Sequence, residues 1–414
     1  MFYIDKIIKM ATISKVEEEL QRGADISIIG LVDSLIEYAY KADASDVHID
    51  PEEKRVRVRL RIDGILNDAF VLPKEIQSEV ITRIKVLSGL RTDEHQAAQD
   101  GRFRLKFKND GFVDIRVSIA PTFYDEDCVM RLLSEKAVKF TLESLGFFPK
   151  DIEKIERNIK KPYGMILATG PTGSGKTTTL YTILKTLNTK EVSIITIEDP
   201  IEYAIEGIEQ IQVNSRTGLT FANGLRSILR QDPNIIMVGE IRDEETAAIA
   251  VNAALTGHLL LSTLHTNDAP TTLPRLLDMK VEPFLIASTV NIAIGQRLVR
   301  RICEECKFEK KVTINDLEGL MGTFPVEILY KSKKFFQGKG CDSCNGTGYR
   351  GRIGIHEVIE IDDELRAAIV RKADATEIKN IAIKNGMTSM IEAGFKKAIE
   401  GVTTIEEVLR VIHE

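Results

Sequence analysis

Residues 165–187 read MILATGPTGSGKTTTLYTILKTL, and this stretch decides the fold. Its apolar start predicts a buried strand, a glycine-rich loop follows, and TTTLYTILKTL predicts a helix. The loop, residues 170–177, matches G-x-x-x-x-G-K-[ST] in full. Its glycines let backbone amides surround a phosphate at a helix N-terminus, where the helix dipole favours negative charge. A chance match in a glycine-rich turn is the alternative, and the strand and helix on either side weigh against it.

The loop predicts an ATPase site that binds ATP with magnesium. Lys176 is expected to reach the β- and γ-phosphates, and the Thr177 hydroxyl is expected to be a ligand of Mg²⁺. The predicted nucleotide-binding residues are Gly170, Pro171, Thr172, Gly173, Ser174, Gly175, Lys176, Thr177 and Thr178.

Three further apolar runs follow the loop: VSIITI at 192–197, NIIMVG at 234–239 and HLLLSTL at 258–264. Stretches with helical patterning separate them. Continuous apolar strands that alternate with helices predict a parallel sheet covered on both faces. The sequence therefore predicts an α/β, RecA-like nucleotide domain over residues 162–298.

Ionisable residues stand at the ends of these runs, where parallel sheets hold their ligands. Glu198 and Glu240 are expected to face the nucleotide, one to hold Mg²⁺ or its waters and one to orient the attacking water, in an order left open. His265 is expected at the same edge, to sense the γ-phosphate or to hydrogen-bond the catalytic acid. Asp243 precedes a helix, so a helix cap is favoured over a site role. His258 begins its strand at the opposite edge, where packing or a subunit contact fits at least as well.

The first part of the chain has a different pattern. Residues 55–62, RVRVRLRI, alternate arginines with apolar residues, which is typical of a half-buried antiparallel strand whose arginines face solvent. Cys128 stands alone on a predicted strand and is expected in the core. A small α+β domain follows from these strands and from the helices and strands expected at 27–43, 73–89, 101–108, 111–119 and 127–133.

The composition excludes several classes of protein. Of 414 residues, 43% are hydrophobic and 29% charged, and the net charge is −6, so a global basic field for nucleic acid is absent. No apolar run approaches the roughly 18–20 residues that a membrane span needs. The N-terminus, MFYIDKIIKM, carries charges among its apolar residues and lacks a signal-peptide cleavage site. We expect a cytoplasmic chain of about two or three domains.

Four of the five cysteines form two Cys-x-x-Cys pairs, Cys303 with Cys306 and Cys341 with Cys344. Four thiolates in two close pairs meet the tetrahedral preference of Zn²⁺, which predicts a structural zinc site in an element at 299–351. Four free thiols are the alternative; in a reducing compartment the pattern suits a metal better than disulfides. A strand and three or four amphipathic helices are expected to complete a C-terminal helical bundle.

Four motifs, in this order and spacing, resemble those of the secretion-superfamily ATPases, the hexameric motors of type II secretion and type IV pilus biogenesis. They are GPTGSGKTTTLY, ITIEDPIEY, LRSILRQDPNIIMVGEIRD and TGHLLLSTLHTNDA. SDVHIDP and RLRIDG are similar to the family's PAS-like N-terminal domain, so the likeness runs from about residue 27 to the C-terminus. Beside Lys176 and Thr177, the resemblance implies Glu198 for the Asp box, Glu240 as the Walker B catalytic carboxylate and His265 for the His box.

The family also brings arginines to the γ-phosphate, where a guanidinium neutralises transition-state charge. Matching DIRVS, CVMRLL and RSILRQDP implies Arg116, Arg131, Arg226 and Arg230. A solvated surface position is the alternative for each of them. The first two would act across a domain boundary, so closure of the N-terminal domain is the expected motion, with a hinge in the connector at 141–161.

The resemblance implies a homo-hexameric motor at the inner face of the cytoplasmic membrane that acts on a membrane platform protein and docking proteins. The tetracysteine element favours assembly over retraction, and the choice between secretion and pilus assembly stays open. Family members usually carry a longer N-terminal extension, whereas about 25 residues precede the likeness here. A DNA-translocating ring is disfavoured by the acidic pI of about 5.8, and an ATP-binding scaffold without turnover by the acidic, histidine and arginine candidates.

The expected segments are a remnant or tether at 1–26, the α+β domain at 27–140, a linker at 141–161, the RecA-like domain at 162–298, the tetracysteine element at 299–351 and the helical subdomain at 352–414.

Overall fold

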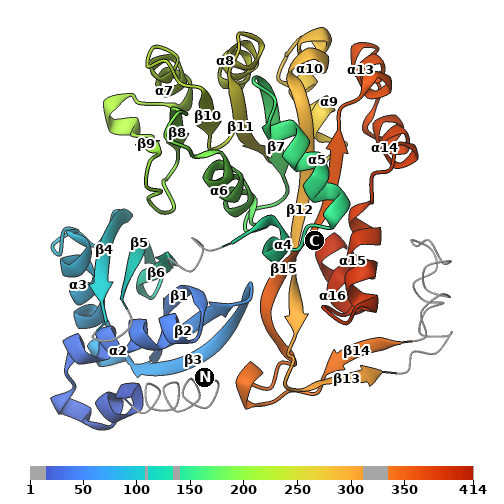
Figure 1. The fold of residues 1–414 in the computed structure, drawn as a ribbon. Helices are drawn as coiled ribbons and strands as arrows, with labels where there is room; N and C mark the ends of the chain where they lie inside the picture. The colour runs from blue at the N-terminus through green and yellow to red at the C-terminus, as the bar shows by residue number, and fades with distance from the viewer. Residues whose placement is uncertain (1–14, 108–110, 134–139, 311–333, 414) are drawn as a thin grey trace. The chain divides into compact units, whose positions relative to one another are not determined.

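The computed structural model of this chain describes residues 15–107, 111–133, 140–310 and 334–413 (Figure 1). The chain divides into two compact units, Met1–Ala137 and Val138–Glu414. The first unit has one sheet and one core, and the second unit has its main sheet, a two-stranded sheet and three cores. Across the described residues, no helix combines the length and apolar character needed to cross a bilayer.

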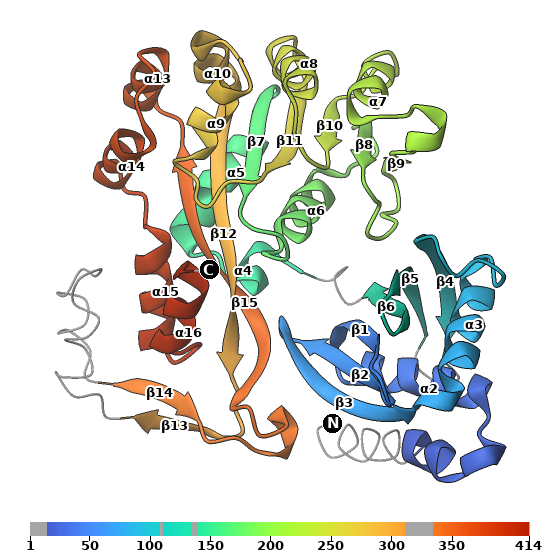
Figure 2. The same ribbon diagram turned by 180° about the vertical axis from the view of Figure 1, so that it is seen from behind.

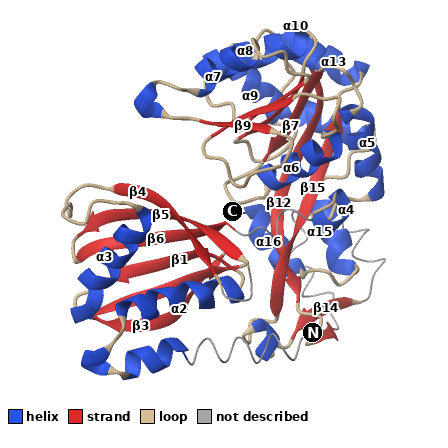
Figure 3. Ribbon diagram, turned by 60° about the vertical axis from the view of Figure 1, so that its left-hand side comes forward, coloured by secondary structure: helices blue, strands red, loops and turns tan. Residues whose placement is uncertain are grey.

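The first unit is a six-stranded antiparallel sheet with two helices, α2 and α3, packed on one face (Figure 3). The strand order is β3-β2-β1-β6-β5-β4. The alternation predicted for residues 55–62 is confirmed, because Val56, Val58 and Leu60 are buried while the arginines between them stay partly exposed. The elements are η1 (Gly23–Asp25), α2 (Ile28–Lys41), β1 (Ala44–Pro51), β2 (Arg55–Ile62), β3 (Ile65–Pro73), η2 (Lys74–Ile76), α3 (Gln77–Ser88), β4 (Gln99–Lys106), β5 (Phe112–Thr122) and β6 (Asp125–Leu133).

The core of the first unit includes residues from near both ends of that unit. Cys128 is fully buried in it, as predicted, and burial raises the pKa of its thiol. Val16 is also fully buried there, so the described part of the expected tether, residues 15–26, packs as part of the unit. The remainder of that tether, residues 1–14, lies outside the described residues.

The second unit is built on a seven-stranded sheet in the order β15-β12-β7-β11-β10-β8-β9. Adjacent strands are parallel except β12 and β15, which pair antiparallel, so the sheet is mixed rather than wholly parallel. Every residue of β7 and β11 is buried, which is why both strands are mostly apolar; the hydroxyl residues Thr169, Ser262 and Thr263 stand toward their carboxyl ends. The strands are β7 (Gly164–Thr169), β8 (Ile194–Glu198), β9 (Glu209–Gln212), β10 (Ile235–Val238), β11 (Leu259–Leu264), β12 (Val290–Ile302) and β15 (Tyr349–Glu360).

Strand β12, Val290–Ile302, is not predicted from the sequence. The predicted nucleotide domain ends at residue 298, inside this strand, whereas β12 runs on to Ile302 beside β15. Its centre, Gly295-Gln296-Arg297, is polar and yet buried, so the apolar signature of a central strand is interrupted there. The strand leads directly into the first cysteine pair.

Helices cover both faces of this sheet (Figures 1 and 2). Side chains of α5 and α6 share one core with one face, and side chains of α7, α8, α9 and α10 share a second core with the other. The helices are α4 (Leu142–Leu145), α5 (Pro149–Ile159), α6 (Lys176–Leu187), η4 (Ser215–Thr217), α7 (Phe221–Ile228), α8 (Glu244–Leu255), α9 (Thr272–Asp278), α10 (Pro283–Thr289), α13 (Asp363–Val370), α14 (Ala375–Lys384), α15 (Met390–Ile399) and α16 (Ile405–His413).

The C-terminal helices form two pairs in different cores. Leu365 of α13 and Ile378 of α14 belong to the core over the sheet, together with α8 and α10. Phe395 of α15 and Val408 of α16 pack instead with Val299 at the far end of β12. The predicted bundle of three or four helices is therefore four helices in two separate pairs.

The segment predicted as a connector belongs to the second unit. Residues 141–161 form α4 and α5, and Ile155 and Ile159 are buried in the core shared with α6. The chain divides instead before Val138. The apolar positions Ile155 and Ile159, one helical turn apart, explain why this charged stretch packs rather than links.

Candidate functional site

The phosphate loop connects β7 to α6, as the motif predicts. Pro171, Thr172 and Gly173 are exposed at its tip, while Lys176 is only 8% exposed at the start of α6. The Lys176 ammonium donates to the carbonyls of Gly170 at 2.8 Å and Pro171 at 3.0 Å. Burial lowers the pKa of Lys176, and the nearby Glu240 opposes that shift. An ammonium and a helix N-terminus therefore lie at one exposed loop, an arrangement that favours binding of an anion.

Side-chain hydrogen bonds join the ends of neighbouring strands at the carboxyl edge of the sheet, next to the loop. Thr169, the last residue of β7, donates from its hydroxyl to the carbonyl of Leu264 at 3.1 Å, and the Thr266 amide donates back to the Thr169 hydroxyl at 3.1 Å. The Thr263 hydroxyl donates to the carbonyl of Gly239 at 2.7 Å. These bonds hold the ends of β7, β10 and β11 together, so the side chains that follow each strand share one edge.

Glu240 and His265 meet at this edge. The carboxylate oxygen Oε2 of Glu240 lies 3.0 Å from Nε2 of His265 and 2.6 Å from Nε of Arg242. Glu240 is 8% exposed as a residue, whereas the side chains of His265 and Arg242 are 45% and 66% exposed. Of the two tasks expected for His265, the geometry shows the hydrogen bond to the carboxylate. Arg242 was not among the predicted site residues, although it stands two residues after Glu240 in GEIRD.

Glu198 has different surroundings. It ends β8 and is 2% exposed, with its oxygen Oε1 accepting from Thr196 Oγ1 at 2.6 Å and from Gln210 Nε2 at 3.1 Å. The hydroxyl of Tyr181, on α6, donates to Oε2. Burial raises the pKa of Glu198, although these three hydrogen bonds oppose the shift. Both oxygens are thus held by neutral groups inside the protein.

The predicted arginines lie in several places. Arg226 pairs with Glu245 at 2.7 Å, and Arg230 donates to the carbonyl of Arg226 at 3.0 Å, so the described contacts hold both on α7 and α8 surfaces. Arg131 belongs to the first unit and pairs with Asp46 at 3.0 Å. Arg116 stands beside it, because the two face each other across β5 and β6.

Two residues with open interpretations take structural positions. Asp243 caps α8, because its carboxylate accepts from the Thr246 amide at 2.8 Å; the cap that the sequence favoured is confirmed. His258 lies before β11, and its Nδ1 is 2.9 Å from the carbonyl of Ala253 at the end of α8.

The four paired cysteines converge. All four sulfur atoms lie within 4.8 Å of one another, with Sγ–Sγ distances of 3.8 Å for Cys303–Cys341, 3.9 Å for Cys306–Cys344 and 3.7 Å for Cys341–Cys344. Zinc–sulfur bonds of about 2.3 Å in a tetrahedron place the sulfurs roughly 3.8 Å apart, so the cluster has the size that Zn²⁺ needs. The cluster lies beside a short hairpin of β13 (Lys307–Lys310) and β14 (Phe335–Gly338), with η5 (Asp342–Cys344). The intervening residues 311–333 lie outside the described residues.

The backbone around Cys344 favours a thiolate. Its sulfur accepts from the amides of Cys341 at 3.1 Å and Gly348 at 3.2 Å. Burial acts to raise the pKa of this thiol, but these amides, together with hydrogen bonds to the thiols of Cys341 and Cys306, lower the pKa to about 7. A sulfur that is readily deprotonated is the form that binds metal.

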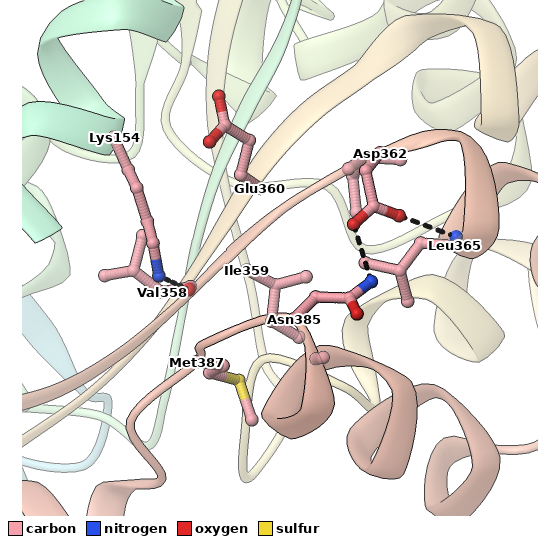
Figure 4. Close-up of a pocket in the computed structure, with 10 residues that line it drawn as sticks. Lys154, Val358, Ile359, Glu360, Asp362, Leu365, Asn385 and Met387 are labelled. Carbon is pink, nitrogen blue, oxygen red and sulfur yellow. Dashed lines mark hydrogen bonds between the residues drawn. The ribbon is translucent and has the colours of Figure 1, made fainter.

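A cavity of about 220 Å³ lies elsewhere in the second unit, between α5, the end of β15 and the start of α13 (Figure 4). Several of its polar groups already have partners, since Asp362 accepts from Asn385 at 2.8 Å and from the Leu365 amide at 2.9 Å. Lys154 donates to the carbonyl of Val358 at 3.3 Å. None of the predicted site residues lines this cavity.

Comparison with known proteins places the chain in a family. A family model described as type II/IV secretion system protein matches residues 21–410. The type IV pilus assembly ATPase PilB of Thermus thermophilus is 50% identical over 91% of this chain, which spans 42% of that protein's length. PilB of Myxococcus xanthus is 44% identical over 95% of the chain and 69% of its own length. Type II secretion system protein E of Pseudomonas aeruginosa is 44% identical over 97% of the chain and 79% of its own length.

Solved structures share the fold. The pilus retraction motor PilT with bound ADP aligns with a TM-score of 0.62 and 25% identity over 91% of this chain and 96% of that chain. The ATPase DotB of Legionella pneumophila aligns with a TM-score of 0.67 and 22% identity over 92% and 95%. The predicted α/β fold class and the predicted family are both confirmed. With the phosphate loop and its neighbouring acid and histidine in place, the chain belongs to the type II/IV secretion system protein family of secretion and pilus ATPases.

Proposed function

We propose that this chain is an ATP-hydrolysing motor that powers a secretion or pilus assembly machine. One observation carries the proposal: Glu240, bonded to His265 and Arg242, stands at the same carboxyl edge of the sheet as the phosphate loop. A triphosphate grip beside an oriented carboxylate is the arrangement that hydrolysis of ATP requires. The names of the relatives support the same activity.

In this proposal the loop amides and Lys176 hold the β- and γ-phosphates. Glu240 orients the attacking water and accepts its proton; both protein contacts fall on Oε2, and we assign the water to Oε1. His265 and Arg242 fix the carboxylate in that orientation. Mg²⁺, when bound, neutralises charge on the phosphates, and we assign the Thr177 hydroxyl as its ligand.

We propose Glu240 rather than Glu198 as the base. Glu198 is held on both oxygens by Tyr181, Thr196 and Gln210, so both oxygens are directed to donors of the protein rather than to an attacking water. The roles implied for Arg116, Arg131, Arg226 and Arg230 stay predictions.

Phosphate release tests the activity directly. Wild-type protein with ATP and magnesium is expected to release phosphate, and Lys176→Ala is expected to abolish nucleotide binding and turnover, because the loop loses its ammonium. Lys190→Ala, on an exposed turn beyond α6, is the matched control for loss of a lysine. The proposal is wrong if wild type neither binds nor splits ATP.

We also propose that the cysteine cluster binds structural zinc. The sulfur separations and the amide donors to Cys344 support it. Zinc when bound would join the two Cys-x-x-Cys turns and stabilise the hairpin between them. Elemental analysis is expected to give about one zinc per chain, and the Cys341→Ser protein is expected to lose it. Metal-free wild-type protein with unchanged thermal stability would contradict the site.

The oligomeric state of the protein and its partners are proposed separately from its activity. We propose that the chain assembles as a homo-hexamer and acts on a membrane platform protein from the cytoplasmic side. Family membership supports this, while the choice between secretion and pilus assembly stays open. Light scattering with a bound ATP analogue measures the assembly, and co-purification with the neighbouring platform protein tests the partner. A protein that stays monomeric with nucleotide would count against the ring.

A further inference from the structure

One buried side chain contacts the phosphate loop from outside the known motifs. Gln296, in the centre of β12, is 1% exposed. Its Nε2 donates to the carbonyl of Ser174 at 2.7 Å, and its Oε1 accepts from the hydroxyl of Thr179 at 2.7 Å. Ser174 lies in the loop, and Thr179 lies in the first turn of α6. The side-chain amide thus joins the loop to the helix that follows it.

The backbone packs as closely as the side chain does. Gly170, with a φ of 146°, has no room for a side chain, because an added Cβ would lie 2.3 Å from the carbonyl oxygen of Gln296. An added Cβ on Gly175 would lie 2.8 Å from Nε2 of the same residue. Gly170 is therefore required by the backbone of Gln296, and Gly175, with a φ of 88°, lies against the side-chain amide of the same residue.

The bond to Ser174 fixes the direction of one loop amide. The carbonyl of Ser174 and the N–H of Gly175 belong to the same peptide unit, and in a trans peptide they point in opposite directions. Because the carbonyl points toward Gln296, the Gly175 N–H points away from β12. Loop amides that point into the loop are the groups that cradle the α- and β-phosphates.

We propose that Gln296 is a positioning residue for nucleotide binding: it orients the Ser174–Gly175 peptide so that the Gly175 N–H serves the phosphates. The inference rests on the proposed nucleotide site. It deepens that proposal by adding a residue which touches the loop and not the nucleotide. Because the α- and β-phosphates occur in both ATP and ADP, the two nucleotides depend on Gln296 alike.

Two substitutions at Gln296 separate the loss of its hydrogen-bond donor from the introduction of a negative charge. Gln296→Met has a similar length and loses both hydrogen bonds without adding charge. Gln296→Glu keeps an acceptor for the Thr179 hydroxyl and loses the donor to Ser174. Both are expected to weaken binding of magnesium–ADP and of a non-hydrolysable ATP analogue by about tenfold or more, the scale of one hydrogen bond to a charged group. Where turnover is measurable, KM for ATP rises by a similar factor while kcat changes less.

Asn291 offers a matched control on the same strand. It is 6% exposed, and its Nδ2 donates to the carbonyl of Tyr163 at 2.9 Å, at the opposite end of β7 from the loop. Asn291→Asp therefore makes the same chemical change in a buried amide–carbonyl bond away from the nucleotide. It is expected to lower the melting temperature and to leave ADP affinity within about twofold of wild type.

Calorimetric titration of folded protein with magnesium–ADP decides the matter, with melting temperatures recorded for each variant. Tenfold weaker binding in both Gln296 variants, with Asn291→Asp unaffected, is the expected result. Wild-type affinity in Gln296→Met overturns the inference, as does a loss confined to Gln296→Glu, which would be charge repulsion. An equal loss in Asn291→Asp also overturns it. If Gln296→Met does not fold, Gln296→Asn, which retracts the amide, replaces it. Absence of ADP binding by wild type would instead remove the nucleotide site itself.

Discussion

Glu198 and Glu240 follow neighbouring parallel strands at the same edge of one sheet, and yet they have opposite surroundings. Glu198 is held by two hydroxyls and an amide, all neutral, in a buried pocket beside α6. Glu240 touches the guanidinium of Arg242 and the imidazole of His265, both partly exposed. The comparison teaches that a strand-end position brings an acid to the site, while its partners decide whether it can exchange protons there.

Glu240→Gln is expected to have the largest effect on kcat and so distinguishes the two glutamates most clearly. The amide keeps the size of the carboxylate and cannot accept a proton from water, so kcat is expected to fall by about 10²–10⁴ while ADP affinity stays close to wild type. Steady-state phosphate release and calorimetric titration measure the two quantities. Glu244→Gln, on the exposed start of α8, is the control. A turnover near wild type would move the base elsewhere.

His265→Ala tests whether the histidine works through Glu240. Loss of the 3.0 Å contact frees the carboxylate to rotate, and kcat is expected to fall by about tenfold. Adding His265→Ala to Glu240→Gln is expected to cost little more, because residues that act as a unit are not additive. If the two losses multiply fully, His265 acts separately from Glu240.

Glu198→Gln should have the smallest effect on rate. Without a role as base, its kcat is expected within about tenfold of wild type, below the contribution typical of a general base. A loss as large as that of Glu240→Gln would reverse the assignment of the two acids.

The same substitution has a pH signature. Because burial raises the pKa of Glu198, the folded protein binds more protons than the unfolded chain above the ordinary glutamate pKa of about 4.3. The contribution of the Glu198 carboxyl to the free energy of unfolding is full below about pH 4.3 and is lost as the pH rises through the pKa that the group has in the folded protein. Relative to wild type, Glu198→Gln should therefore gain melting temperature as pH rises from the ordinary glutamate pKa toward neutrality. An unchanged difference across that range would show that Glu198 is ionised in the folded protein.

Local patterns in the sequence predicted the parts that depend on neighbours in the chain. The phosphate loop, its strand and its helix are contiguous in the chain. The four strands predicted from apolar runs are buried, because helices cover both faces of their sheet. The cysteine pairs predicted a cluster because each Cys-x-x-Cys turn brings two thiols together. The cap at Asp243 follows from its place before a helix.

Contacts between residues far apart in the chain could not be predicted from the sequence. The two glutamates could not be distinguished, because Gln210 and His265 come from other segments. Strand β12 was missed because its buried polar residues have partners far along the chain: Gln296 bonds the loop, and Arg297 donates to the carbonyl of Val411 on α16 at 2.8 Å. A buried polar residue gives no apolar signal, and its partner is visible only in the fold.

The two borders of the seven-stranded sheet bear on how copies of this protein can join. Strand β9, at one border, is four residues long and reads EQIQ, with polar side chains at three of its four positions. At the other border, Lys154 of α5 already occupies the carbonyl of Val358 on β15. Strand β9 is therefore too short and too polar to be a template for hydrogen-bonding a foreign strand. Contact between copies at the β9 border would rely on side-chain surfaces, which can slide and re-form, rather than on a shared sheet, which would lock them.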